Sequence, residues 1–116
     1  MKYYLLIYRN ESQPPQYTPE QQRALYQSWQ DYTAEAKAAG VYLSSDGLRP
    51  VTDATTVRLR NGKTLITDGP FAETHEQLAG YFLLNCKDLD EAIAWAAKLP
   101  GIDTDSVEIR PNWAQA

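Results

Sequence analysis

The chain has 116 residues and a net charge of −4, with 43% apolar and 22% charged residues, which suits one globular domain spanning residues 1–116. No run of about 18 apolar residues occurs, so a membrane-spanning helix is not expected. The acidic balance argues against nucleic-acid binding, because contacts with phosphates require a basic face.

The sole cysteine, Cys86, excludes a disulfide within one chain and a cysteine-based metal site. The first nine residues contain a lysine and a short apolar run but no small-residue cleavage site, so they suit a strand better than a signal peptide. We therefore expect a cytoplasmic protein, and nothing in the residue pattern predicts a metal or a cofactor.

Residues 2–9 predict a strand that is apolar on both faces. Successive side chains of a strand point to opposite sides. One face is therefore expected to carry Tyr3, Leu5 and Ile7, and the other Tyr4, Leu6 and Tyr8.

The first helix is predicted between Thr18 and Gly40. Thr18 is the expected N-cap, Pro19 takes the first helical position, and Gln21 completes a capping box. Gly40 is expected to end the helix in a left-handed conformation. A stripe at helical spacing is expected to face the core: Leu25, Trp29, Tyr32, Ala36 and Ala39.

A second strand begins at residues 41–43 and is expected to be interrupted near Asp46-Gly47. The clearest hairpin of the chain follows it. Residues 55–60 and 63–67 are rich in strand formers, and Asn61-Gly62 between them suits a type I′ turn, which needs positive φ at both central residues.

Three further elements complete the prediction. Residues 80–86 form a strand that is again apolar on both faces, and residues 106–110 form the last strand. A second helix begins after the N-cap Asp88 and ends at Pro100-Gly101. Its buried side is expected to consist of Leu89, Ala92, Ile93, Ala96 and Leu99.

The order of elements predicts an α+β fold. Apart from the extra β-hairpin, it is the ferredoxin-like βαββαβ arrangement, with two helices on one face of an antiparallel sheet. Two helices cover only one face, yet strands 2–9 and 80–86 are apolar on both. Because so large an apolar patch is unusual on a monomer, we expect a homodimer formed through the second sheet face.

The candidate functional residues lie in and after Asp68-Gly69-Pro70-Phe71. Asp68 leaves a strand at a turn, where aspartate is also favoured because its side chain bonds its own backbone. Glu73 and His75, the only histidine, follow shortly. No recognised ligand spacing accompanies His75, so a metal site is not predicted.

The relation between Glu73 and His75 depends on the local backbone, which the sequence leaves open. In a helical turn over residues 72–78, His75 faces Leu78 and Ala79. In an extended segment, Glu73 and His75 point the same way, and the carboxylate can orient the imidazole for general acid–base catalysis.

Six residues are the resulting site candidates. The catalytic candidates are Asp68, His75 and Glu73. Three others are candidates for binding a small-molecule substrate: Arg58, which can hold an anionic group; Phe71, which serves as a loop anchor or a stacking platform; and Tyr81, one of eight tyrosines.

The segment from Thr67 to Thr74, with Glu76-Gln77-Leu78 and Gly80-Tyr81 after it, resembles the signature of the YCII-related proteins of the DGPF type. The resemblance covers nearly the whole chain. Further matching segments are Met1-Lys2-Tyr3, Leu5 to Tyr8, Ala38 to Val41, Gly47 to Pro50, Thr56-Val57-Arg58, Leu89 to Ala92, Ala94 to Ala97, and Val107 to Pro111.

This resemblance implies a ferredoxin-like fold assembled as a dimeric α/β barrel, in bacterial proteins often found beside extracytoplasmic-function sigma factors and mostly without an assigned activity. The wider group is similar to a lyase-type enzyme that removes chloride from a hydroxylated aromatic ring, for which a His–Asp pair has been proposed. The family usually has lysine where this chain has His75.

Two functions are compatible with these observations. The first is a small lyase- or isomerase-type enzyme in which Asp68 and His75 share acid–base work on a small, ring-bearing molecule and Glu73 orients them. The second is a non-catalytic dimeric module that senses a ligand or contacts a partner related to a sigma factor.

Overall fold

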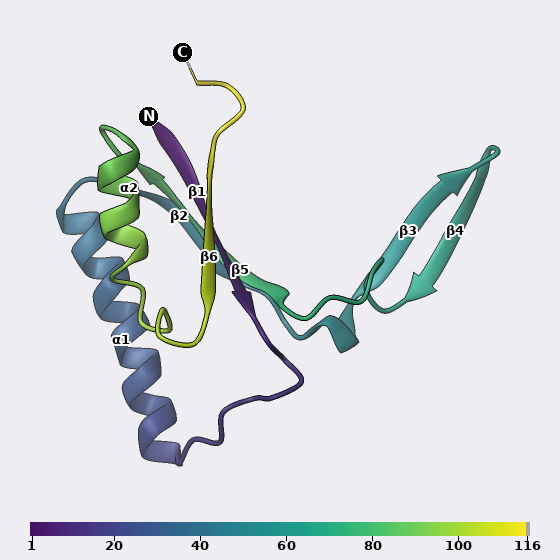
Figure 1. Cartoon of the computed structure of the whole chain (residues 1–116), viewed down its shortest axis with the longest axis horizontal. Helices are drawn as coiled ribbons and strands as arrows, with labels where there is room; N and C mark the ends of the chain where they lie inside the picture. Colours follow the sequence, from purple (N-terminus) through teal and green to yellow (C-terminus); the bar gives the residue numbers. More distant parts are fainter. Residues whose placement is uncertain (116) are drawn as a thin grey trace.

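The computed structural model describes residues 1–115 and has one four-stranded antiparallel sheet with two helices on one of its faces (Figure 1). The elements are β1 (Lys2–Arg9), α1 (Pro19–Ala38), β2 (Tyr42–Gly47), η1 (Val51–Asp53), β3 (Thr55–Arg60), β4 (Lys63–Asp68), β5 (Gln77–Asn85), α2 (Leu89–Ala96) and β6 (Ser106–Pro111). The sheet order β2-β5-β1-β6 is that of a ferredoxin-like βαββαβ fold, and the β3–β4 hairpin is inserted between β2 and β5. The predicted fold class is confirmed.

Strand β1 lies in the middle of the sheet, where it pairs antiparallel with β5 and β6. Tyr3, Leu5 and Ile7 are buried on the face that the helices cover. Leu5 lies opposite Phe82 of β5 and Ile109 of β6, so these three side chains share that face. The alternation predicted for residues 2–9 is therefore confirmed.

Helix α1 begins and ends at the predicted signals. The backbone N–H of Gln21 donates to Thr18 Oγ1 at 3.1 Å, and the N–H of Thr18 donates to Gln21 Oε1 at 2.9 Å, which completes the capping box. At the other end Gly40 has a φ of 75°, and the N–H of Val41 donates to the carbonyl of Ala36. Tyr32 and Ala36 of the predicted stripe are buried.

Helix α2 is shorter than predicted and confirms only part of the predicted buried side, namely Ala92, Ala96 and Leu99. It ends at Ala96 instead of Leu99, and Leu89 and Ile93 are each 49% exposed. The buried face contains Trp95, whose ring meets Tyr32 edge-on at 5.7 Å between centroids. The helix is apolar nearly all round, so packing selected the face: the large indole fills the space beside Tyr32, and the small Ala92 and Ala96 let the helix approach the sheet.

No helix within residues 1–115 covers the opposite face of the sheet. Two rows of directly opposed residues cross it: Leu83, Tyr4 and Arg110, then Tyr81, Leu6 and Glu108. The side chains contributed by β1 and β5 (Tyr4, Leu6, Tyr81 and Leu83) are only half-buried. We call this surface the open face.

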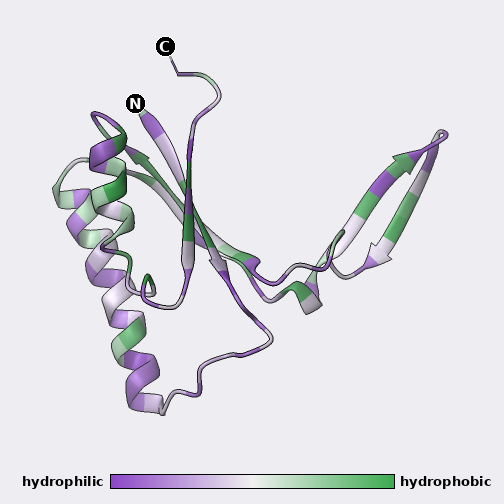
Figure 2. Cartoon of the chain, in the orientation of Figure 1, coloured by the Kyte–Doolittle hydropathy of each residue, from purple (hydrophilic) through white to green (hydrophobic). Residues whose placement is uncertain are grey.

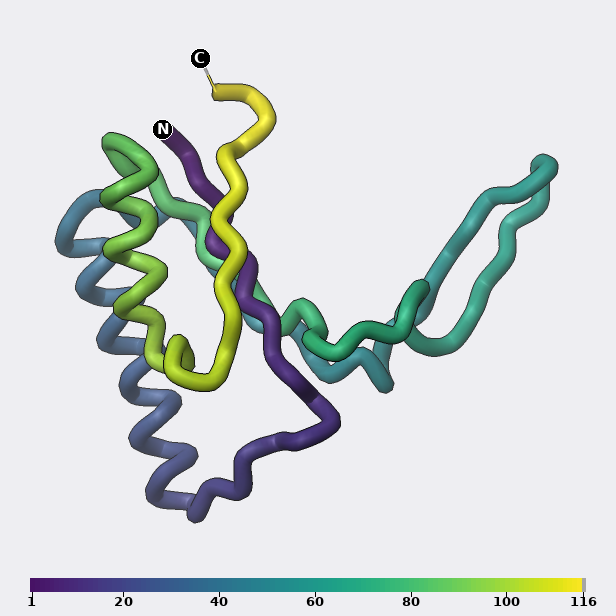
Figure 3. The backbone as a smooth tube through the Cα atoms, in the orientation of Figure 1, coloured from purple at the N-terminus to yellow at the C-terminus, as the bar shows by residue number. Residues whose placement is uncertain are grey.

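Strands β3 and β4 pair with each other and form a separate two-stranded sheet, which we call the arm (residues 55–68). Asn61 and Gly62 have φ values of 51° and 75°, which confirms the predicted turn. The arm projects from the end of the main sheet, on the side away from the helices (Figures 1 and 3). The radius of gyration of 16.4 Å reflects this projection, since a compact domain of this length has about 13.4 Å.

Candidate functional site

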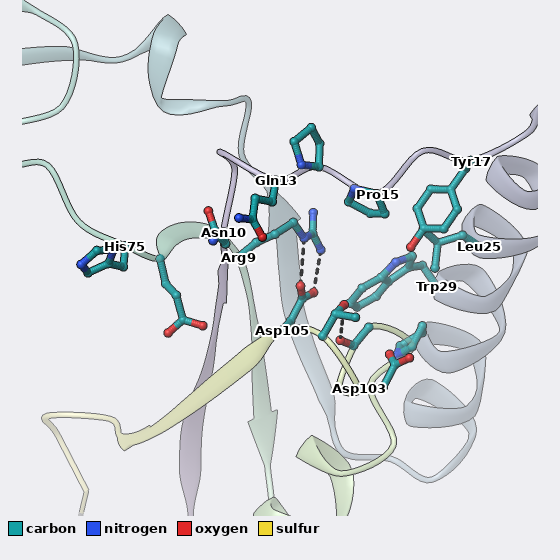
Figure 4. A pocket seen from close by; sticks show the side chains of 15 residues that line it. Arg9, Asn10, Gln13, Pro15, Tyr17, Leu25, Trp29, His75, Asp103 and Asp105 are labelled. Carbon is teal, nitrogen blue, oxygen red and sulfur yellow. Dashed lines mark hydrogen bonds and ion pairs between the residues drawn. The ribbon is translucent and has the colours of Figure 1, made fainter.

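A cavity of about 790 Å³ lies between the loop that follows β1, the N-terminal half of α1 and the loop that precedes β6 (Figure 4). Its volume is in the range of small-molecule sites. The three walls come together because β1 and β6 are neighbours in the sheet, while residues 10–17 carry the chain from the end of β1 to the start of α1.

An ion pair between Arg9 and Asp105 forms the polar centre of the cavity. Arg9 Nε lies 3.2 Å from Asp105 Oδ1, and Arg9 Nη2 lies 2.9 Å from Oδ2 (Figure 4). The Asp105 side chain is 5% exposed, whereas that of Arg9 is 43% exposed. The hydrogen bonds to Asp105 raise the pKa of Arg9 above its ordinary value, against the opposing effect of burial. The pair joins the end of β1 to the start of β6.

Aromatic rings form the wall on the α1 side. Trp29 is half-buried and stacks on Phe82 of the sheet, with 6.1 Å between ring centroids and 13° between planes. Tyr17 stands beside Trp29 at the same wall, from the loop before α1 (Figure 4). Such rings can stack on a planar ligand.

His75 and Glu76 reach the rim of this cavity from the segment that precedes β5. Glu76 Oε1 accepts a hydrogen bond from Ser106 Oγ at 2.8 Å, and Thr74 Oγ1 donates to the Glu76 carbonyl at 2.7 Å. The His75 side chain lies on the side opposite Trp29, with its ring turned away from the Arg9–Asp105 pair (Figure 4). The segment is irregular, so neither a helical turn over residues 72–78 nor a strand through His75 is present.

Asp68 and Glu73 lie elsewhere. Asp68 ends β4 and is opposite Thr55 at the base of the arm. Glu73 lines a smaller hollow of about 420 Å³, together with Val51 of η1 and with Gln77. Asp68, Glu73 and His75 are all exposed, and within a single chain no described cavity is lined by all three.

The three candidates for substrate binding are also outside the cavity. Arg58 projects from the arm, and its Nη2 donates to the carbonyl of Phe71 at 3.0 Å. The Phe71 side chain itself is 76% exposed. Tyr81 lies on the open face, where its hydroxyl donates to Ser44 Oγ at 3.4 Å. Arg58 and Phe71 therefore lie near each other, apart from Tyr81.

Sequence reasoning missed the Arg9–Asp105 pair and Tyr17, and it assigned Trp29 only to the core. Arg9 and Asp105 are 96 positions apart, so no local spacing connects them. The sequence pattern that could have indicated this ion pair is weak: a charged residue at the end of an apolar strand and an aspartate just before the last strand.

The described residues contain no group of three or more His, Cys, Asp or Glu side chains placed to hold a metal ion. Within the same residues, 1–115, no helix has both the length and the apolar character needed to cross a membrane.

Comparison with known proteins agrees with the fold. The model of the YCII-related domain matches residues 1–114. An uncharacterised protein of Rhizobium meliloti (strain 1021) is 36% identical over 113 residues, which covers 96% of this chain and 91% of that protein. The match extends over the cavity, the arm and both helices, and on this evidence the chain belongs to the YCII-related family.

Proposed function

We propose that the protein is a cytoplasmic, homodimeric enzyme of the DGPF type that carries out lyase- or isomerase-type acid–base chemistry on a small, ring-bearing molecule. One observation carries the proposal: the only histidine lies at the rim of a cavity that also contains the Arg9–Asp105 ion pair and an aromatic wall.

The cavity indicates the kind of molecule that binds. Trp29 and Tyr17 offer ring faces for stacking. Apart from His75, the charged residues that line the cavity are Glu76, Asp103 and Asp105, with three negative charges, and Arg9, with one positive charge, so their formal charges sum to −2. This balance favours a neutral or cationic ring with hydrogen-bond donors over a carboxylate or phosphate.

His75 is the proposed proton-transfer group. Imidazole serves as acid and as base near neutral pH. In this scheme the Arg9–Asp105 pair holds the cavity wall in place, because both carboxylate oxygens of Asp105 are already bonded to Arg9. The exposed side chain of Asp103 is free to accept a hydrogen bond from the ligand.

The homodimer is proposed to form through the open face. On the open face, β1 and β5 contribute the aromatic and aliphatic side chains of Tyr4, Leu6, Leu83 and Tyr81. The neighbouring strand β6 contributes Glu108 and Arg110. Burying this surface between two copies would remove from water the apolar side chains that a monomer leaves exposed. Five further residues are proposed to act in this dimer, since each lies on a surface that a second chain can approach. The acid–base partners are Asp68 and Glu73, and the ligand contacts are Arg58, Phe71 and Tyr81.

The test combines binding with turnover. A chlorinated hydroquinone is added to the ¹⁵N-labelled protein, and amide shifts and chloride release are recorded. Shifts are expected at residues 9–17, 75–76 and 101–105. His75→Gln is expected to lower turnover about a hundredfold or more with little change in binding, whereas Trp29→Leu is expected to weaken binding. Shifts confined to other regions, or full turnover by His75→Gln, would refute the proposal.

The second candidate is a non-catalytic ligand-binding or regulatory module linked to an extracytoplasmic-function sigma factor. The exposure of Asp68, Glu73 and His75, and their distribution over separate surfaces, favours it. Ligand-induced shifts without any turnover, together with unchanged regulation in an Asp68→Asn, His75→Ala double variant, would establish it over the enzyme.

A further inference from the structure

One face of the arm is apolar and exposed. Val57 is opposite Ile66 in the β3–β4 register and shares its face with Leu59. The exposed fractions of these three residues are 64% for Val57, 69% for Ile66 and 64% for Leu59. Figure 2 shows the apolar bands on both arm strands, far from the core of the domain. We call these three residues the arm face.

Hydrogen bonds extend the β3–β4 pairing beyond the ends of the two strands. At its base the N–H of Gly69 donates to the Ala54 carbonyl at 2.7 Å, and Thr56 Oγ1 donates to the Gly69 carbonyl at 2.8 Å. Arg58 is tied to the Phe71 carbonyl. A lone two-stranded hairpin is marginal in water. A hairpin with three uncovered aliphatic side chains is therefore expected to pack against a surface that covers them.

Charge favours a second copy of this chain as the source of that surface. The other side of the arm carries Arg58, Arg60 and Lys63, and Asp68 is the only acid of residues 55–68, so the arm has a net charge of +2. The whole chain has a net charge of −4, which leaves −6 on the remainder. A second copy of this chain therefore presents an acidic body to a basic arm.

Surface area supports the same partner. The chain exposes 8465 Å², whereas a folded monomer of 13.1 kDa is expected to expose about 6,400 Å². The excess of about 2,000 Å² exceeds the roughly 800 Å² per partner of a standard interface. The arm also projects on the side of the sheet opposite the helices, the side of the open face (Figure 1). A copy seated on the open face thus lies within reach of the arm.

We propose that the arm of each copy packs its arm face, Val57, Leu59 and Ile66, against the body of a second copy, while Arg58, Arg60 and Lys63 on the other side of the arm add a longer-range attraction to that acidic body. This inference rests on the proposed homodimer and is independent of the chemistry in the cavity. It adds a structural role for the insertion between β2 and β5.

The first test is the strength of self-association. A Leu59→Ser, Ile66→Ser variant is compared by sedimentation equilibrium with the unchanged chain and with Leu89→Ser, Ile93→Ser, a control that removes one leucine and one isoleucine, each 49% exposed, from α2. The dissociation constant is expected to rise about a hundredfold in the arm variant and to stay unchanged in the control. Far-UV circular dichroism checks that the sheet and helices persist.

A second measurement does not depend on substitutions that could unfold the arm. A photoreactive benzoylphenylalanine replaces Leu59, and light and ¹⁵N-labelled copies are mixed before illumination. Cross-linked peptides that join a light and a heavy chain, with the second site in the four-stranded sheet, are expected.

The possible outcomes distinguish the arm proposal from the homodimer proposal. A chain that stays monomeric at high micromolar concentration overturns both. The arm proposal is overturned, and the homodimer proposal stands, if two results are obtained together. Leu6→Ser and Leu83→Ser on the open face weaken the dimer while the arm variant does not, and cross-links form only within one chain.

Discussion

Arg9 and Asp105 form a two-hydrogen-bond ion pair that connects the last residue of β1 to the loop before β6, with one partner buried and the other half-exposed. The pair closes one wall of the cavity and holds two distant segments together. A second pair, Arg49–Asp53, has nearly the same distance of 2.9 Å but lies on the surface.

Removing the buried partner should therefore cost stability. Asp105→Ala leaves the Arg9 guanidinium without its two acceptors and should lower the free energy of unfolding by about 1–3 kcal/mol, measured by urea denaturation. Arg49→Gln, which breaks the exposed pair, should change it by less than about 0.5 kcal/mol. Equal effects of the two variants would contradict the structural role assigned to Arg9–Asp105.

Gly80 lies where β5 approaches β2 closely. A Cβ on Gly80 would come within 2.7 Å of the Asp46 carbonyl oxygen, whereas a Cβ on its partner Gly47 would meet nothing within 4 Å. Gly80→Ala should destabilise the fold by about 1–3 kcal/mol, and Gly47→Ala should be close to neutral. Thermal unfolding of both variants checks this, and the reverse order would show that the β2–β5 contact is looser than described.

Cys86 should be unreactive in the folded chain. Burial first, and then the negative charge of Glu91, raises the pKa of Cys86 from its ordinary 9.0 to about 11. At pH 8 the thiolate should be about a hundredfold rarer than in the unfolded chain, so alkylation by iodoacetamide should be slower by at least that factor. Rates with and without urea measure it, and equal rates would refute the burial.

The same shift has a consequence for stability against pH. The folded state favours the neutral thiol, so the contribution of Cys86 is fully present below pH 9 and is lost as pH rises from 9 to 11. The unchanged chain should therefore lose more stability across this window than Cys86→Ala, in parallel urea titrations. A Cys86→Ala chain with the same loss would assign the effect to other groups.

Thr18 should contribute to stability as a cap. Thr18→Ala removes the acceptor of the Gln21 N–H and should cost about 1 kcal/mol. Ser28→Ala is the matched control, because the Ser28 hydroxyl bonds the Ala24 carbonyl within the helix and alanine is the better helix former. Its effect, followed by chemical denaturation, should be neutral or slightly stabilising; a larger loss from Ser28→Ala would contradict the capping assignment.

The elements whose ends were predicted well depend on interactions between close neighbours. The capping box joins Thr18 and Gln21, and the positive φ values of Asn61-Gly62 and of Gly40 are properties of single residues. Local rules therefore sufficed for α1 and for the arm turn. For α2 the same rules gave Ala92, Ala96 and Leu99 correctly. They did not choose between Leu89, Ile93 and Trp95, which are all apolar, because only packing against Tyr32 selects Trp95.

The candidate site was predicted less completely. His75 was identified because it is the only histidine and lies in an acidic segment. Its neighbours in space were not identified, because Trp29, Arg9 and Asp105 belong to segments that meet only after the sheet has formed.

By itself, the sequence determined the α+β class, the order of the strands and helices, and the two central strands that are apolar on both faces. These features depend on side-chain periodicity and on turn residues, which act over a few positions of the chain. Only the tertiary structure decided that Arg9 meets Asp105, that His75 reaches a cavity apart from Asp68 and Glu73, and that the hairpin leaves the sheet as an arm. These relations depend on long-range packing, in which many weak contacts between distant segments are satisfied together, and no local pattern records them.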